Sequence, residues 1–246
     1  MALTVILGLA FTLAATFVSM ALFVRTSFGR VPHAITLLPV PLVLYNLWMS
    51  AWFVFECLRQ FVLTAMTPGS ALRMVAFVFL VAALCSVACL YGCVSVVHQF
   101  LGGQATRRVR RGARYLALAW SAMLIVGWSA YHFHADSGLF TTMRGWLGHA
   151  AFPLALGSWI WLLAGARRLT DTSWRASVEK LARAYVGLFS MMFVFSVVRG
   201  RMEAAAPPLP LVIDVFLVLA YTLVTVRWVE SIQRAARSGS RHPAIP

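Results

Sequence analysis

Residues 72–98 read LRMVAFVFLVAALCSVACLYGCVSVVH, a stretch in which Arg73 carries the single formal charge. A helix needs roughly 20 apolar residues to cross a hydrocarbon core about 30 Å thick, so this segment is long enough to span a membrane. Similar segments fall near residues 2–24, 34–58, 113–133, 146–166, 182–199 and 209–229. The sequence therefore predicts an all-α protein, a polytopic bundle of seven transmembrane helices.

The composition indicates the same class of protein. Hydrophobic residues make up 61% of the 246 residues and charged residues only 11%, whereas about 25% of residues are charged in soluble domains. The connections between the apolar segments are short, so we expect residues 1–237 to form a single membrane domain. The polar, proline-containing residues 238–246 are expected to form a disordered cytoplasmic tail.

Basic residues gather at alternate connections between the apolar segments. On one predicted side lie 16 of the 21 basic residues: Arg25, Arg30, Arg107, Arg108, Arg110, Arg111, Arg114, Arg167, Arg168, Arg175, Lys180, Arg183, Arg227, Arg234, Arg237 and Arg241. The other side has Arg59, Arg73, Arg144, Arg199 and Arg201. Because Lys and Arg in short loops stay in the cytoplasm, we expect the N-terminus outside and the C-terminus inside, in a bacterial inner (plasma) membrane.

The net charge of +14 would suggest a nucleic-acid partner in a soluble protein. Here topology and attraction to anionic lipids explain it, since each basic residue close to such a surface contributes about 1 kcal/mol. We expect no nucleic-acid partner. The residues predicted to contact anionic lipid of the cytoplasmic leaflet, or a partner protein, are Arg107, Arg108, Arg110, Arg111, Arg167 and Arg168.

Ionisable residues also converge at the predicted outer face. Ionised groups within membrane spans are costly and normally face the bundle interior or a wet cavity. Arg199 or Arg201 is the expected counter-ion of Asp214, because a short hairpin joins their segments. A polar ligand pocket is predicted from Glu56, His132, His134, Asp136, His149, Arg199 and Asp214.

The histidines at this face allow more than one interpretation. The H-x-H-x-D run from His132 to Asp136, together with His149, supplies imidazole and carboxylate ligands that suit zinc or copper. The metal hypothesis assigns His132, His134 and His149 as ligands. A metal-free polar pocket, a pH-sensitive patch and ordinary interfacial histidines are the alternatives.

The positions of histidine and lysine residues bear on two possible cofactors, haem and retinal. A haem would use histidines of neighbouring segments, either His33 with His98 or the histidines of the outer face. All of these histidines lie at segment ends, whereas membrane haems usually need ligands within the bundle. A retinal Schiff base is excluded, because the single lysine, Lys180, lies in a predicted cytoplasmic connection, and Val218 follows Asp214 by one turn.

Two segments show distinctive local features. Pro39 and Pro41 remove two backbone donors and are expected to kink or loosen the helix over residues 34–58. Cys85, Cys89 and Cys93 recur every four residues, and such stripes of small side chains let helices approach closely in lipid. We therefore expect these cysteines to serve packing.

The order of these features resembles the seven-helix membrane sensor regions that precede kinase, cyclase or DNA-binding outputs in bacterial signalling proteins. The resemblance rests on Arg25 after the first segment, the 107–114 and 167–183 basic regions, the prolines at 207–210 and the continuation at 228–232. It implies a seven-helix fold and a sensing role. Because the chain ends soon after residue 229, the output is expected on another polypeptide.

The leading functional hypothesis is a non-enzymatic membrane protein, a sensor-like module or an accessory subunit of a larger complex. No P-loop, G-x-G-x-x-G after a strand, G-x-S-x-G or D-x-D motif occurs, and no catalytic residue is assigned. The alternative is a membrane redox or metal-dependent enzyme that uses the outer histidines. A small transporter is the third hypothesis, although paired broken helices are not evident.

Overall fold

The computed structural model describes residues 2–28, 37–61, 68–134, 153–169, 172–206 and 208–237, and all regular structure within them is helical. The helices are α1 (Ala2–Phe28), α3 (Pro39–Phe61), α4 (Pro68–Leu101), α5 (Gly103–His134), a short helix Pro153–Ala166, α7 (Thr172–Ala205) and α8 (Pro208–Arg237). The all-α prediction is therefore confirmed.

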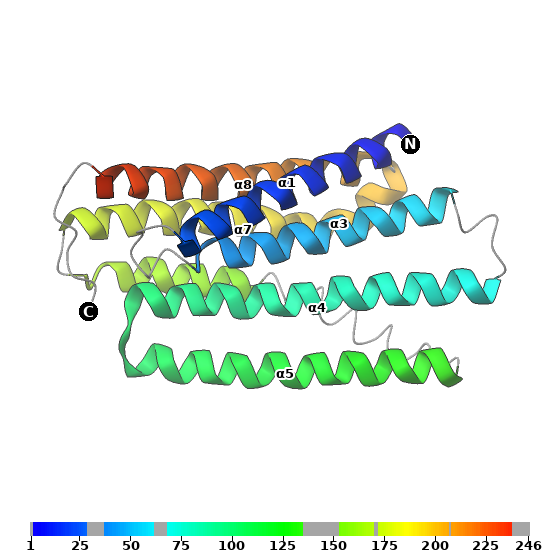
Figure 1. The fold of residues 1–246 in the computed structure, drawn as a ribbon, viewed down its shortest axis with the longest axis horizontal. Coiled ribbons are helices and arrows are strands. Elements are labelled where there is room, and N and C mark those ends of the chain that lie inside the picture. Colours follow the sequence, from blue (N-terminus) through cyan, green and yellow to red (C-terminus); the bar gives the residue numbers. More distant parts are fainter. Residues whose placement is uncertain are drawn as a thin grey trace.

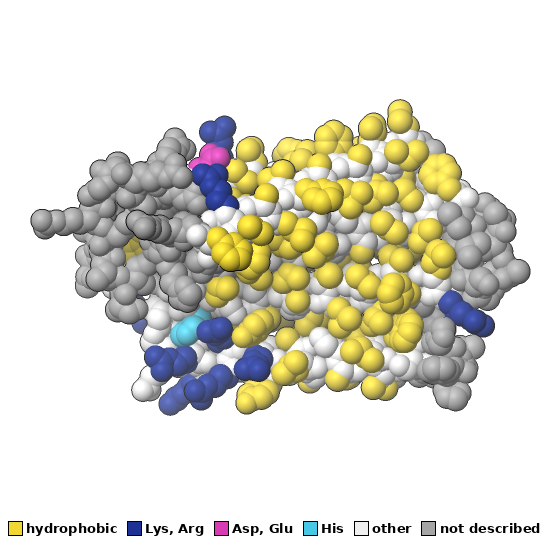
Figure 2. Space-filling view, viewed as in Figure 1, with side chains coloured by type: hydrophobic (Ala, Val, Ile, Leu, Met, Phe, Trp, Pro, Cys, Tyr) yellow, Lys and Arg dark blue, Asp and Glu magenta, His cyan; other side chains and the backbone are white. Residues whose placement is uncertain are grey.

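Five helical segments within the described residues are long and apolar enough to cross a membrane: Leu3–Phe28, Pro39–Leu58, Phe77–Leu101, Trp174–Arg199 and Pro208–Ser231. Large apolar side chains lie on the surface of the bundle, among them Phe17 at 72% exposure and Val126 at 61%. Figure 2 shows hydrophobic side chains as a broad band across the visible face of the bundle. A surface of this kind suits lipid, so the chain is a multi-pass integral membrane protein.

The long helices run side by side along one axis (Figure 1). α1 contacts α3 and α8, α3 also contacts α4 and α8, and α7 contacts α8. α5 packs against α4 at the edge of the bundle. Helices α1 and α3 approach each other closely at Gly8, because a Cβ atom there would lie 2.0 Å from Cε1 of the buried Phe53.

The arginine-rich segments predicted as connections are helical instead. Arg107 to Arg114 lie within α5, and Arg175 to Arg183 lie within α7. Arginine and lysine are good helix formers, so helices of 32 and 34 residues extend beyond their apolar portions. In α7, Glu179 accepts from Arg175 at 3.0 Å and from Arg183 at 3.2 Å, which supports the helix.

The predicted kink at Pro39 and Pro41 is also wrong. α3 begins at Pro39, so both prolines occupy its first turn, where backbone N–H groups have no intrahelical acceptor to lose. The expected close packing of the small-residue stripe is confirmed. Cys89 Sγ donates to the Pro41 carbonyl at 3.3 Å, and a Cβ atom at Gly92 would lie 3.3 Å from Pro41 Cγ.

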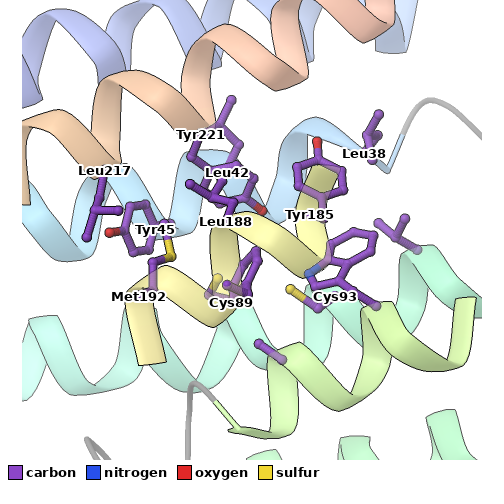
Figure 3. Packing of buried hydrophobic residues seen from close by; sticks show 14 of the residues in the cluster. Leu38, Leu42, Tyr45, Cys89, Cys93, Tyr185, Leu188, Met192, Leu217 and Tyr221 are labelled. Atoms are coloured by element: carbon purple, nitrogen blue, oxygen red, sulfur yellow. The ribbon is translucent and has the colours of Figure 1, made fainter. Parts of the chain in front are cut away.

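Aromatic side chains fill the centre of the bundle (Figure 3). The ring of Tyr221 lies 5.4 Å from Tyr45 and 5.5 Å from Tyr185, between centroids. Trp159 of the short helix lies 4.4 Å from Tyr185. These fully buried rings connect α3, α7, α8 and the short helix in one core.

Candidate functional site

An ion pair joins α7 and α8 near their connection. Arg199 Nη1 donates to Asp214 Oδ1 at 2.9 Å and to Oδ2 at 2.8 Å. The Asp214 side chain is 5% exposed and that of Arg199 is 23% exposed. The expected counter-ion is therefore present, and it is Arg199, while Arg201 is exposed.

Aromatic rings surround the guanidinium group of Arg199. Its Cζ atom lies 5.1 Å from the centroid of Trp52 on α3 and 5.6 Å from that of Phe195, one turn earlier on α7. Trp52 in turn contacts Phe55 and Phe79 at 5.5 and 6.0 Å between centroids. A cation above desolvated rings gains attraction from their negative faces, so these rings stabilise the arginine in an apolar environment.

The same part of α3 carries a stripe of polar groups. Trp52, Glu56 and Gln60 follow one another at intervals of four residues and therefore share a helix face. Glu56 is 7% exposed. Trp52 Nε1 and Gln60 Nε2 are buried and have no hydrogen-bond acceptor among the described residues. We call Trp52, Glu56, Arg199 and Asp214 the Asp214 cluster; Gln60 lies about 12 Å further along α3 than Trp52.

The Asp214 cluster has the chemistry of a recognition site for an anion or another acceptor-rich group. It combines one arginine with a buried N–H donor that lacks an acceptor, Trp52 Nε1, beside two carboxylates. Buried donors without acceptors are costly, so a ligand that supplied acceptor oxygens would recover that free energy. Sequence patterns identified Glu56, Arg199 and Asp214. Trp52 was missed, although its spacing of four residues from Glu56 is visible in the sequence.

The predicted histidine group is not part of the described site. His132 and His134 lie in the last turn of α5, and nothing is described of their side chains, while Asp136 and His149 lie outside the described residues. Within the described residues there is no group of three His, Cys, Asp or Glu side chains that could hold a metal. The metal hypothesis therefore stays a prediction.

The haem hypothesis also stays a prediction. Of its inner pair, His33 lies outside the described residues. His98 lies near the end of α4, and its Nδ1 atom is 2.7 Å from the Thr106 hydroxyl of α5. This hydrogen bond closes the α4–α5 hairpin, in which Gly102 and Gly103 have positive φ angles of 61° and 83°.

A polar network in the middle of the bundle was not predicted. The buried Asn46 Nδ2 donates to the Ala15 carbonyl and to Thr222 Oγ1, each at 3.1 Å. The hydroxyl oxygens of Tyr185 and Thr225 lie 2.7 Å apart and share a hydrogen bond between α7 and α8. These bonds connect α1, α3, α7 and α8, so they specify how the helices pack.

Exposed basic side chains gather at the opposite end of the bundle from the Asp214 cluster. We call this the arginine-rich end, and it comprises Arg107, Arg108, Arg111, Arg114, Arg167 and Arg168. Figure 2 shows dark blue side chains at this end, beside the apolar band. Arg110, predicted with them, is half-buried and its side chain lies close to the Tyr91 hydroxyl of α4. The described members of the predicted lipid or partner surface thus share one end.

Comparison of the whole chain with known protein families, with curated proteins and with solved structures finds no match.

Proposed function

We propose that this chain is a non-enzymatic integral membrane protein, a sensor-like module or an accessory subunit of a larger membrane complex. The Asp214 cluster is its recognition site, and the arginine-rich end contacts anionic lipid and a membrane or cytoplasmic signalling partner. In this proposal the chain spans a bacterial inner membrane seven times. α5 and the segment ending at Ala166 are the sixth and seventh membrane spans, in addition to the five long apolar helices. The N-terminus lies outside and the C-terminus in the cytoplasm.

The gathering of basic side chains at one end supports this orientation. Arg107, Arg108 and Arg111 are exposed on α5, and Arg167 and Arg168 follow the short helix. Since Lys and Arg in short connections remain on the cytoplasmic side, the arginine-rich end is the cytoplasmic one. The Asp214 cluster then faces the outside, where an external ligand has access to it.

One observation carries the recognition role: an ion pair and the unsatisfied N–H donor of Trp52 are buried together near one end of an apolar bundle. Ionisable groups within a membrane span are expensive, and their default explanation is function. Arg199 is 23% exposed, so a ligand can approach it. A ligand carboxylate or phosphate would compete with Asp214 for the guanidinium and accept from the Nε1–H donor of Trp52.

Competition with Asp214 would change the contact between α7 and α8. The ion pair is an interhelical bond, so its exchange for a ligand weakens the attachment of Asp214 to Arg199. Both helices continue from the cluster to the other end of the bundle. In one state Arg199 is paired with Asp214, and in the other it is paired with the ligand. A ligand that binds the second state more tightly shifts the equilibrium between the two, which is the physical requirement for a sensor.

Co-purification tests the proposal. The tagged chain is extracted in mild detergent, and the recovered proteins are identified and quantified by mass spectrometry. We expect a stoichiometric protein partner, lost from the triple variant Arg107→Gln, Arg108→Gln, Arg111→Gln. Arg201→Gln is the matched control, because it removes an exposed arginine at the opposite end. Recovery of the wild-type chain as a lone monomer, also after cross-linking in the membrane, would contradict the proposal.

Metal and haem analysis separates the proposal from the enzyme hypothesis. We expect the purified protein to contain no stoichiometric zinc or copper and to show no Soret band. A bound ion that is lost from the His132→Ala variant, or a haem spectrum, would favour the redox or metal-dependent enzyme. The variant His98→Ala serves as a control for the outer histidines, because His98 lies at the α4–α5 hairpin near the other end of the bundle.

A further inference from the structure

A large apolar groove lies between α4, α5 and the helix Pro153–Ala166. Its volume is about 710 Å³, within the range of roughly 300–1,000 Å³ that is typical of ligand sites. The lining is almost wholly apolar and includes Val87, Leu90, Leu116, Trp120, Leu154 and Trp161. The groove does not belong to the Asp214 cluster, since none of its lining residues is a member of that cluster.

The groove has the depth of one lipid leaflet. On α5 its lining extends from Val109 to Trp120, which corresponds to a rise of about 16 Å. A hydrocarbon core is about 30 Å thick, so one leaflet contributes about 15 Å. The groove begins beside the arginines of α5 and continues into the apolar part of the bundle. Its length therefore suits acyl chains that enter from the leaflet at the arginine-rich end.

Positive charge lies at the mouth of the groove. Tyr91 lines it, and the guanidinium groups of Arg110 and Arg114 lie close enough to the Tyr91 hydroxyl to interact with it electrostatically. The α4, α5 and Pro153–Ala166 sequences contain no Asp or Glu. The basic mouth therefore has no acidic counter-charge from the helices that form it, and an anionic group complements it.

Two glycines leave the groove open. Gly112 of α5 and Gly157 of the short helix both line it, and a Cβ atom at either position would meet no atom within 4 Å. A Cβ atom at either position therefore meets no neighbour, and a larger side chain there would take up space in the groove. This property makes both glycines suitable for a direct test.

We propose that this groove binds one anionic phospholipid. Its acyl chains lie along the apolar lining, and its phosphate accepts hydrogen bonds from Arg110, Arg114 and the Tyr91 hydroxyl. The site is independent of the proposed sensing role, because it lies at the arginine-rich end and shares no residue with the Asp214 cluster. A transmembrane helix of a partner is the less suitable occupant, since the groove covers one leaflet and has a basic mouth.

Native mass spectrometry of the delipidated protein with added phosphatidylglycerol or phosphatidylcholine measures the binding. We expect one phosphatidylglycerol molecule to bind more tightly than phosphatidylcholine. Gly157→Leu and Gly112→Leu fill the groove and should each lower the affinity for phosphatidylglycerol at least tenfold. Gly187→Leu is the matched control, because Gly187 also has open space around its Cβ position but lies on α7, outside the groove.

The double variant Arg110→Gln, Arg114→Gln tests the headgroup contact. Loss of two basic residues should weaken phosphatidylglycerol binding by about 30-fold and leave phosphatidylcholine binding little changed. Arg227→Gln is the matched control, since it removes an exposed arginine from α8, which does not line the groove. Thermal unfolding of every variant establishes that it is folded before its binding is interpreted.

Three results would overturn the proposal. The first is phosphatidylglycerol affinity that is unchanged in folded Gly157→Leu and Gly112→Leu proteins. The second is equal affinity for the two lipids in the wild-type protein. The third is loss of a protein partner or of a dimer in the filled variants without loss of lipid, which would identify the groove as a protein interface. None of these results bears on ligand binding at the Asp214 cluster.

Discussion

Replacement of Asp214 by leucine tests whether the α7–α8 ion pair stabilises the bundle. Removal of one partner from a buried ion pair costs about 3–5 kcal/mol, because the other charge remains buried. Arg199 is 23% exposed, so solvent screens part of this cost. The rings of Trp52 and Phe195 contact the guanidinium in the wild type as well, so their attraction does not change the difference between the two proteins. After the allowance for screening, the expected net loss in free energy of unfolding is about 1–3 kcal/mol.

The assay is thermal unfolding of the purified protein in detergent. A loss of about 1–3 kcal/mol corresponds to a Tm lower by about 2–12 °C for a chain of this size. The double variant Arg199→Met, Asp214→Leu should recover most of the wild-type Tm, because no buried charge of the pair remains. Arg201→Gln is the control and should unfold with the wild type, since Arg201 is exposed and lies two residues from Arg199.

Two results would refute this reasoning. If Asp214→Leu has the wild-type Tm, the ion pair contributes nothing to stability. If the double variant loses as much stability as Asp214→Leu and Arg199→Met together, the two residues act independently. Their contact is then not the cause of the stability loss in Asp214→Leu. In either case the buried position of Asp214 would need an explanation other than its bond to Arg199.

Further expectations concern topology and packing. In a Cys57→Ser background, a membrane-impermeant maleimide should label Gln104→Cys only in inside-out vesicles and Ala205→Cys only in right-side-out vesicles. The opposite labelling pattern would contradict the proposed orientation. Gly8→Ala should destabilise the protein by about 1–3 kcal/mol, because the new Cβ atom would lie 2.0 Å from a buried ring atom of α3. Gly187→Ala, with open space around it, should be neutral or slightly stabilising. Equal Tm values for these two variants would contradict the close α1–α3 contact at Gly8.

The features that could be predicted from the sequence are those that a helix needs in order to be stable in lipid. Apolar length located the helices, and the cost of burying a carboxylate indicated that Asp214 needed an arginine. The choice between Arg199 and Arg201 could not be made, since two residues along a helix differ by about 200° in direction. Only the rotation of α7 against α8 decides it, and that rotation depends on the packing of all the buried rings between them.

Helix ends were less predictable than helix cores. The arginines of α5 were assigned to a connection because charge ends an apolar segment, but charge does not end a helix, and arginine favours one. The polar network at Asn46 was missed for a different reason. Single asparagines and threonines within apolar segments are common, and only the placement of α1 and α8 beside α3 shows that Asn46 has partners there.

Two bonds between described residues of α7 and α8 lie at different levels of the bundle. Arg199 and Asp214 join the helices near their connection, whereas Tyr185 and Thr225 join them about 16–21 Å further along. If a ligand replaces Asp214 as the partner of Arg199, the Tyr185–Thr225 bond remains and acts as the fixed point. Movement of α8 at the Asp214 cluster then produces an opposite movement beyond Thr225, at the end that carries Arg227. The mid-bundle bond thus gives the proposed sensor a physical route from the Asp214 cluster to the arginine-rich end.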